Sequence, residues 1–181
     1  LTIEFKEEMS GMLAYSLFPT SWGWMGVVGS ENGVKKIILP QKSPETVHRL
    51  MRQEDRNLQE GTAYFTELCL RLKKYINGDR VRFEDKIDFH KASPFQLQVW
   101  DATCSIPWGE TRSYGWLAQQ IGRPHHSRAV GQALASNPVP LVIPCHRVVG
   151  QDGYLTGYRG GVPLKKYLIN MEASSPLVGA S

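Results

Sequence analysis

The chain has 181 residues, of which 41% are hydrophobic and 21% are charged. This is the composition of an ordinary folded protein, which excludes an intrinsically disordered or collagen-like chain. The formal charge of +4 lies entirely in residues 91–181, which hold eight basic and four acidic side chains, whereas residues 1–90 hold thirteen of each. The asymmetry favours a polyanion as partner of the second half, although solubility also explains so small a surplus.

Three cysteines without a Cys-x-x-Cys pair do not form a disulfide framework, which predicts a reducing, intracellular compartment. The first residues lack the apolar core of a signal peptide. The longest apolar runs, such as residues 139–143, have the length of a strand rather than of a membrane span. We therefore expect a cytoplasmic protein, or a nuclear one in a eukaryote, without membrane association. Residues 175–181 are expected to form a flexible tail.

The first half begins with strand patterns. Residues 13–18, 24–29 and 34–39 are apolar runs, and the Asn32-Gly33 pair between the last two is a strong hairpin signal. Residues 83–89 are expected to add a closing strand.

Two helices are expected between these strands. The Ser43-Pro44 pair is typical of a capped helix start. A second helix over residues 61–76 ends at Asn77 and carries an apolar stripe of Phe65, Leu68, Cys69, Leu72 and Tyr75. Residues 1–90 therefore predict a small α/β domain, and they contain no chemical motif.

The second domain, predicted over residues 91–174, has mostly helical patterns. Three helices are expected, with boundaries at Ser93-Pro94 and Cys104, at Ser113 and Gly122, and at His126 and Asn137 before Pro138. The last two are short and are joined by a glycine-containing turn, which is typical of a helix-turn-helix. An ordinary helical hairpin has the same pattern.

The third of these helices favours DNA binding. It is rich in small residues, and it keeps Gly131 although glycine costs helix stability. We therefore expect another molecule to approach this helix closely. Its arginine, Arg128, lies at the N-terminus, where the helix dipole favours a phosphate.

Cys145 is the candidate nucleophile. Cys69 and Cys104 lie on apolar helix stripes and are expected to be buried. Cys145 instead lies in an apolar, strand-like segment beside His146 and Arg147, whose burial costs free energy unless they are paired. A nearby imidazole lowers a thiol pKa and so favours the reactive thiolate.

In an extended segment, neighbouring side chains point to opposite sides, so His146 is expected to act on Cys145 through a water. Glu172 is the candidate carboxylate that orients His146 from behind. A coincidental Cys-His pair is a serious alternative for the dipeptide alone. It is a weak one for the whole segment that follows Asn137.

The sequence Pro144-Cys145-His146-Arg147-Val148 resembles the active-site signature of the O6-alkylguanine-DNA alkyltransferases. The order of motifs over residues 95–172 is similar to that family throughout: Tyr114, the Arg128-Ala129-Val130-Gly131 helix, Asn137-Pro138-Val139-Pro140, the cysteine motif and Gly157-Tyr158-Arg159-Gly160-Gly161. The first half resembles the family's N-terminal domain in size and element order. The resemblance implies a ribonuclease-H-like α/β domain, followed by a mostly α domain with a winged helix-turn-helix-like unit.

The resemblance also implies a DNA repair protein that transfers an alkyl group irreversibly to its own Cys145. The substrate is O6-alkylguanine, and also O4-methylthymine, flipped out of the duplex. His146 then takes the thiol proton through a water, Glu172 orients His146, and Asn137 acts as a hinge that braces the recognition helix.

The remaining implied roles concern DNA and the base. Arg128 replaces the flipped nucleotide in the stack, and Tyr114 turns the phosphate and donates to the guanine ring. The other DNA-facing residues are Ser127, Ala129, Gly131 and Ala135. The substrate pocket consists of Tyr114, Pro140, Cys145, Val148, Tyr158 and Arg159. Position 159 is often serine in relatives, so its backbone amide is expected to face the guanine O6.

The implied partner is double-stranded alkylated DNA, bound through its minor groove with an affinity that depends on salt. The resemblance implies no cofactor, and we expect a monomer without an obligate protein partner. Some relatives carry a structural zinc, but Cys69, His48 and His90 are widely separated here, so no metal site is expected.

Two other functions compete with this one. A non-catalytic lesion sensor of the same fold carries another residue, commonly tryptophan, at the cysteine position, so Cys145 argues against it. A thiol hydrolase that uses Cys145 and His146 lacks an evident oxyanion arrangement.

Overall fold

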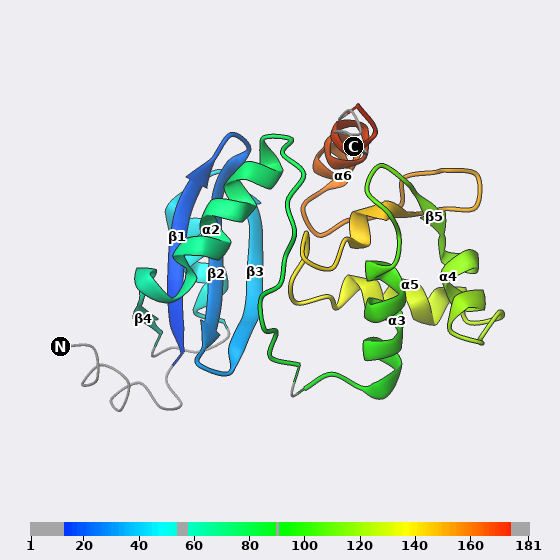
Figure 1. The fold of residues 1–181 in the computed structure, drawn as a ribbon, viewed down its shortest axis with the longest axis horizontal. Coiled ribbons are helices and arrows are strands. Elements are labelled where there is room, and N and C mark those ends of the chain that lie inside the picture. Colours follow the sequence, from blue (N-terminus) through cyan, green and yellow to red (C-terminus); the bar gives the residue numbers. More distant parts are fainter. Residues whose placement is uncertain (1–12, 54–57, 90, 175–181) are drawn as a thin grey trace, which may run out of the picture. The chain divides into compact units, whose positions relative to one another are not determined.

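The computed structural model describes residues 13–53, 58–89 and 91–174 and divides into two compact units (Figure 1). The first unit holds the chain up to residue 77 and residues 81–90, and the second holds residues 78–80 and the chain from residue 91 onwards. The tail expected over residues 175–181 lies outside the described residues, as does His90. The predicted α/β class is confirmed, with a mixed sheet and helices.

The first unit contains a four-stranded sheet of order β3-β2-β1-β4. Its strands are β1 (Ala14–Thr20), β2 (Gly23–Ser30), β3 (Gly33–Gln41) and β4 (Gln59–Glu60). The first three are antiparallel neighbours, and β4 runs parallel to β1. The predicted hairpin between β2 and β3 is confirmed. Gly33 has a φ of +131° there, which only glycine adopts readily.

Two helices, α1 (Pro44–Met51) and α2 (Thr62–Ile76), pack against this sheet. The predicted cap of α1 is confirmed, because the Ser43 hydroxyl accepts a hydrogen bond from the Thr46 amide at 3.3 Å. The predicted apolar stripe of α2 is also buried: Phe65, Leu68, Cys69, Leu72 and Tyr75.

The closing strand predicted over residues 83–89 is wrong. This segment makes one parallel bridge to the sheet, between Val34 and Ile87. Its acidic residue Asp85 forms an ion pair with Arg71 of α2 at 2.6 Å. The segment is therefore held by a side chain of α2 and by a single bridge rather than by a full ladder.

The second unit is mostly helical and includes a two-stranded parallel sheet. In chain order its elements are α3 (Pro94–Cys104), β5 (Arg112–Ser113), α4 (Tyr114–Gln120), α5 (Ser127–Ala135), the 3-10 helix η2 (Cys145–Arg147), β6 (Val148–Val149) and α6 (Val162–Ser174). The last helix, α6, was not among the predicted elements. None of the helices within the described residues is both long enough and apolar enough to cross a membrane.

The predicted starts of α3 and α4 are confirmed by their caps. Ser93 and Gln96 form a reciprocal capping box, and the Ser113 hydroxyl accepts a hydrogen bond from the Trp116 amide at 3.0 Å. Helix α5 ends at Ala135, two residues before the predicted end at Asn137.

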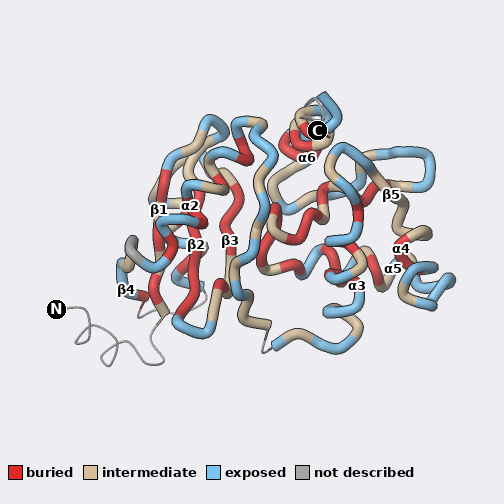
Figure 2. The backbone as a smooth tube through the Cα atoms, in the orientation of Figure 1, coloured by how far each residue is buried: buried red, intermediate tan, exposed pale blue. Residues whose placement is uncertain are grey.

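The core of the second unit joins the helices around the cysteine segment (Figure 2). Trp100 of α3 is buried, and its indole donates a hydrogen bond to the Ala133 carbonyl of α5 at 2.8 Å. Leu117 of α4 and Val130 of α5 are completely buried. These contacts fix α5 beside the residues that follow it.

Two sequence predictions in this unit are wrong. The segment around Cys145 is the 3-10 helix η2 rather than an extended strand, because Pro144 has no amide proton to donate to a ladder and the Arg147 amide bonds back to the Pro144 carbonyl at 2.9 Å. Cys104 is exposed rather than buried, because it lies at the last turn of α3 on its solvent side.

Candidate active site

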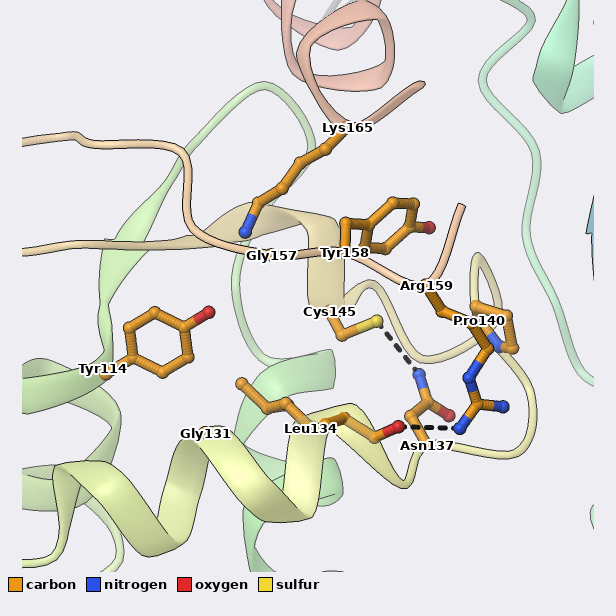
Figure 3. A pocket seen from close by; sticks show the side chains of 11 residues that line it. Tyr114, Gly131, Leu134, Asn137, Pro140, Cys145, Gly157, Tyr158, Arg159 and Lys165 are labelled. Carbon is orange, nitrogen blue, oxygen red and sulfur yellow. Dashed lines mark hydrogen bonds between the residues drawn. The ribbon is translucent and has the colours of Figure 1, made fainter. Parts of the chain in front are cut away.

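Cys145 lies in a pocket of about 410 Å³ in the second unit (Figure 3). The pocket is lined by Tyr114 of α4, by Gly131, Leu134 and Ala135 of α5, by Asn137, Pro140 and Cys145, by Gly157, Tyr158 and Arg159, and by Lys165 of α6. Most of the predicted pocket residues therefore lie together. Val148 is the exception, because it is completely buried and does not line the pocket.

Asn137 holds the chain around the nucleophile. Its side-chain amide nitrogen lies 3.3 Å from Sγ of Cys145 and 3.0 Å from the Ile143 carbonyl, and its oxygen accepts the Val139 amide at 3.0 Å. Burial raises the pKa of the Cys145 thiol above its usual 9.0, although this hydrogen bond and the charges of Lys165 and Arg159 favour the thiolate. The thiol therefore needs a base at neutral pH.

His146 and Glu172 form a buried pair behind Cys145. Nε2 of His146 lies 2.9 Å from Oε1 of Glu172, and both side chains are almost completely buried. Burial lowers the pKa of His146 below 6.5, and the neighbouring Glu172 offsets only part of this effect. A neutral imidazole, the form that accepts a proton, is therefore favoured.

Arg147 completes this network. Its Nε and Nη2 donate to the two oxygens of Glu172 at 2.8 and 3.0 Å, and its Nη1 donates to the Ile106 carbonyl at 2.7 Å. Burial alone would raise the pKa of Glu172, but the hydrogen bonds from His146 and Arg147 lower it from 4.5 to about 2. Glu172 is therefore a carboxylate that holds His146 in one orientation.

The 3-10 helix η2 explains why the side chains of Cys145 and His146 point in different directions. Alternation along an extended strand, the reason given above for keeping His146 away from the Cys145 sulfur, does not apply to a 3-10 helix. Here the backbone turns at Pro144, so that His146 points into the core toward α6 while Cys145 lines the pocket.

Helices α4 and α5 and the turn between them present an accessible surface. Arg128 and Ala135 are exposed, and Ser127, Ala129 and Gly131 are half-buried, so all the residues predicted to face DNA on α5 remain accessible. The turn contains Gly122, with a φ of +70°. Tyr114 is the first residue of α4, and its hydroxyl is 2.7 Å from the hydroxyl of Thr156.

Residues 94–174 match the family profile described as 6-O-methylguanine DNA methyltransferase, DNA binding domain. The methylated-DNA–protein-cysteine methyltransferase of Methanosarcina acetivorans is 36% identical over 162 residues, which is 88% of this chain and 98% of the relative. The chain belongs to the methylated-DNA–protein-cysteine methyltransferase family.

Solved structures of this family agree with the fold. Mycobacterium tuberculosis OGT in complex with DNA has a TM-score of 0.76 at 34% identity, covering 89% of this chain and 93% of that one. The O6-methylguanine-DNA methyltransferase of Pyrococcus kodakaraensis has a TM-score of 0.67 at 27% identity, covering 89% and 99%.

The methyltransferase pocket also contains residues that sequence reasoning missed. Lys165 is buried, lines the pocket and donates to the Val148 carbonyl at 2.6 Å. Helical spacing places Leu164, Leu168 and Glu172 on one buried stripe, and this pattern could have located α6 and its neighbour Lys165. Thr156 and its contact with Tyr114 carried no signal in the sequence.

Within the part of the chain that the structure describes, no group of three or more His, Cys, Asp and Glu side chains could hold a metal ion. Cys69 lies on α2 and His48 on α1, and His90 lies outside that part.

Proposed function

We propose that this chain repairs alkylated DNA by flipping O6-alkylguanine out of the duplex and moving the alkyl group to Sγ of Cys145. The observation that carries the proposal is Cys145 in an open pocket, with Asn137 bonded to its sulfur and the buried His146–Glu172 pair behind it. Membership of the methyltransferase family supports the same reaction. O4-methylthymine is a further candidate substrate.

The transfer is a single displacement. The thiol proton passes to His146 through a water, and the sulfur forms a bond to the alkyl carbon as the bond from that carbon to O6 breaks. The electron pair stays with the guanine, which takes up one proton from solvent, and His146 then releases the thiol proton to solvent. The products are guanine and a thioether on Cys145, so each molecule acts once.

His146 is assigned as the group that accepts the thiol proton, and Glu172 as the carboxylate that orients His146. The lowered pKa of His146 supports a neutral imidazole that can accept the thiol proton, and the lowered pKa of Glu172 supports a carboxylate that stays charged behind it. Asn137 acts as a positioning residue, since its hydrogen bond to Sγ stabilises the developing thiolate.

DNA is assigned to the surface of α4 and α5. We infer that α4 and α5 form a helix-turn-helix, with the strands β5 and β6 and the loop 150–157 as a wing. The small residues of α5 support docking in the minor groove, and the exposure of Arg128 supports its role in filling the space left by the flipped base. Tyr114 would contact the nucleotide at the pocket mouth.

We also propose a fold for the first unit, a cellular compartment and an oligomeric state. The order of strands and helices supports a ribonuclease-H-like fold, and three free cysteines support an intracellular, reducing compartment. We propose that the chain acts on double-stranded DNA as a monomer.

Mass spectrometry tests the function directly. After the protein is mixed with duplex DNA that contains O6-methylguanine, we expect one added methyl group, on Cys145. Cys145→Ser should stay unmodified, while Cys69→Ser and Cys104→Ser should still be methylated. An unmodified wild-type protein, or a label on Cys69 or Cys104 instead, would contradict the proposal.

A further inference from the structure

The pocket around Cys145 has an uneven charge. Two cationic side chains, Arg159 and Lys165, line it, and its lining residues include no carboxylate. The nearby Glu172 lies behind the pocket, where His146 and Arg147 occupy both of its oxygens. An anion that enters the pocket would therefore meet two positive charges without a competing negative one.

Arg159 is held at the pocket wall by one hydrogen bond. Its Nη2 donates to the Ala135 carbonyl at 2.7 Å, at the C-terminal end of α5, where the helix dipole favours a cation. Among the described residues, no carboxylate forms an ion pair with Arg159. A guanidinium has five N–H donors, so most of them remain available to a ligand.

Lys165 supplies the second charge from another direction. In Figure 3 its side chain descends from α6, while that of Arg159 lies beside Asn137, with the sulfur of Cys145 between the two. Its ammonium is anchored to the Val148 carbonyl at 2.6 Å. Both charges act on the Cys145 thiol, which places them close to the point of alkyl transfer.

We propose that Arg159 makes the pocket selective for O6 adducts of guanine that end in a carboxylate, such as O6-carboxymethylguanine. This inference rests on the proposed alkyl transfer to Cys145. Lys165 contributes to the same positive field, and Arg159 is the residue that contacts the carboxylate.

Two physical effects produce the selectivity. A carboxylate that leaves water for a partly closed pocket loses solvation, and a charge-assisted bond to a guanidinium restores it, often through two parallel hydrogen bonds. The negative charge of the adduct also repels the thiolate, and the two cations offset that repulsion. A methyl adduct gains from neither effect.

The chemical step stays the same with this substrate. The sulfur of Cys145 forms a bond to the methylene carbon, and the bond from that carbon to O6 breaks. The electron pair goes to the guanine, which takes up one proton from solvent. The thiol proton goes to His146, which then releases it to solvent. The product is a carboxymethyl thioether, whose carboxylate stays beside Arg159.

The test compares two adducts of similar size. Single-turnover rate constants are measured with duplexes that contain O6-carboxymethylguanine, its neutral analogue O6-carbamoylmethylguanine, or O6-methylguanine. We expect the wild type to prefer the charged adduct over the neutral one. Arg159→Gln should reduce that ratio by about tenfold, equivalent to roughly 1.4 kcal/mol. Arg159→Lys keeps the charge but not the paired donors, so it should retain only part of the ratio.

Lys166→Gln is the matched control, because Lys166 is exposed on α6 and does not line the pocket. Its ratio should equal that of the wild type. Arg159 is exposed, so its variants should fold, and thermal melting checks this.

Three results would overturn the inference. One is a wild type without preference for the charged adduct, and another is an Arg159→Gln variant with an unchanged ratio. The third is an Arg159→Gln variant that binds DNA more weakly and transfers all three adducts more slowly by the same factor. That result would assign Arg159 to a DNA phosphate instead. Wild-type protein that transfers no methyl group would contradict the proposed function itself. Normal methyl transfer, with the same ratio of charged to neutral adduct rates in the wild type and in Arg159→Gln, would contradict only the selectivity.

Discussion

The side-chain amide of Asn137 donates a hydrogen bond to the sulfur of Cys145, with a distance of 3.3 Å between the two atoms. The same buried side chain bonds the Ile143 carbonyl and the Val139 amide, so it fixes the chain on both sides of the pocket. Asn137 therefore links the stability of this loop to the reactivity of the nucleophile.

Replacing Asn137 with alanine should reduce both properties. The change leaves the buried Val139 amide without its partner, whereas the Ile143 carbonyl keeps its hydrogen bond from the Cys145 amide. One unsatisfied buried group costs about 1–3 kcal/mol of unfolding free energy. It also removes a donor that stabilises the thiolate, so the rate of alkyl transfer should fall. Denaturant unfolding and single-turnover transfer measure the two effects. Asn170→Ala, at an exposed position of α6, should change neither. Full activity in Asn137→Ala would show that Asn137 does not act on the thiol.

Glu172 should make the stability of the protein depend on pH in acid. Its pKa falls from 4.5 to about 2 on folding, so its carboxylate stabilises the native state above pH 4.5. That contribution is lost as the pH falls from about 4.5 to about 2, and it amounts to roughly 3 kcal/mol. Urea unfolding at a series of pH values should show this loss in the wild type.

The variant Glu172→Gln isolates the effect. It should be less stable than the wild type at neutral pH, because Arg147 and His146 lose their charged partner. The difference in stability between the two proteins should shrink as the pH falls below 4.5. A difference that stays constant down to pH 2 would show that Glu172 has an ordinary pKa.

His146 should determine how the rate of transfer depends on pH. Burial lowers its pKa below 6.5, so the imidazole stays neutral and the wild-type rate should persist at mildly acidic pH. In His146→Gln the thiol loses its base, and the rate should fall by about 100-fold near neutral pH. It should then rise by about tenfold per pH unit, because only hydroxide deprotonates the thiol. His48→Gln, in the first unit, serves as the control. Parallel pH profiles for His146→Gln and the wild type would remove His146 from the proton transfer.

The sequence predicted correctly those features that depend on residues close together in the chain, such as the helix caps. Ser43, Ser93 and Ser113 were each expected to cap a helix, and each side chain accepts the hydrogen bond of a cap. The pairing of His146 with Glu172 was also expected, because a buried histidine beside a nucleophile needs an acceptor.

Two of the failures depended on contacts between distant segments. Residues 83–89 alternate like a strand, but the ion pair of Asp85 with Arg71 requires knowledge of where α2 lies. The burial of Lys165 depends on the Val148 carbonyl, which is far away in the sequence. The turn at Pro144 is a local feature, and the missing amide proton of proline could have argued against a strand there.

Substitution of Gly131 should have opposite effects on the stability of α5 and on DNA binding. A Cβ at this position would meet only the ring of Tyr114, at 3.7 Å and 3.8 Å, which are ordinary contact distances. Gly131→Ala should therefore stabilise the helix by roughly 0.5–1 kcal/mol. The added methyl group would lie beside Tyr114 at the pocket, on the helix assigned to DNA. The affinity for a duplex should therefore fall, and Gly131→Val should bind more weakly still. Thermal unfolding and fluorescence anisotropy measure the two properties, with Gln119→Ala at an exposed position of α4 as the control. A more stable Gly131→Ala variant with unchanged DNA affinity would show that DNA docks elsewhere on the chain.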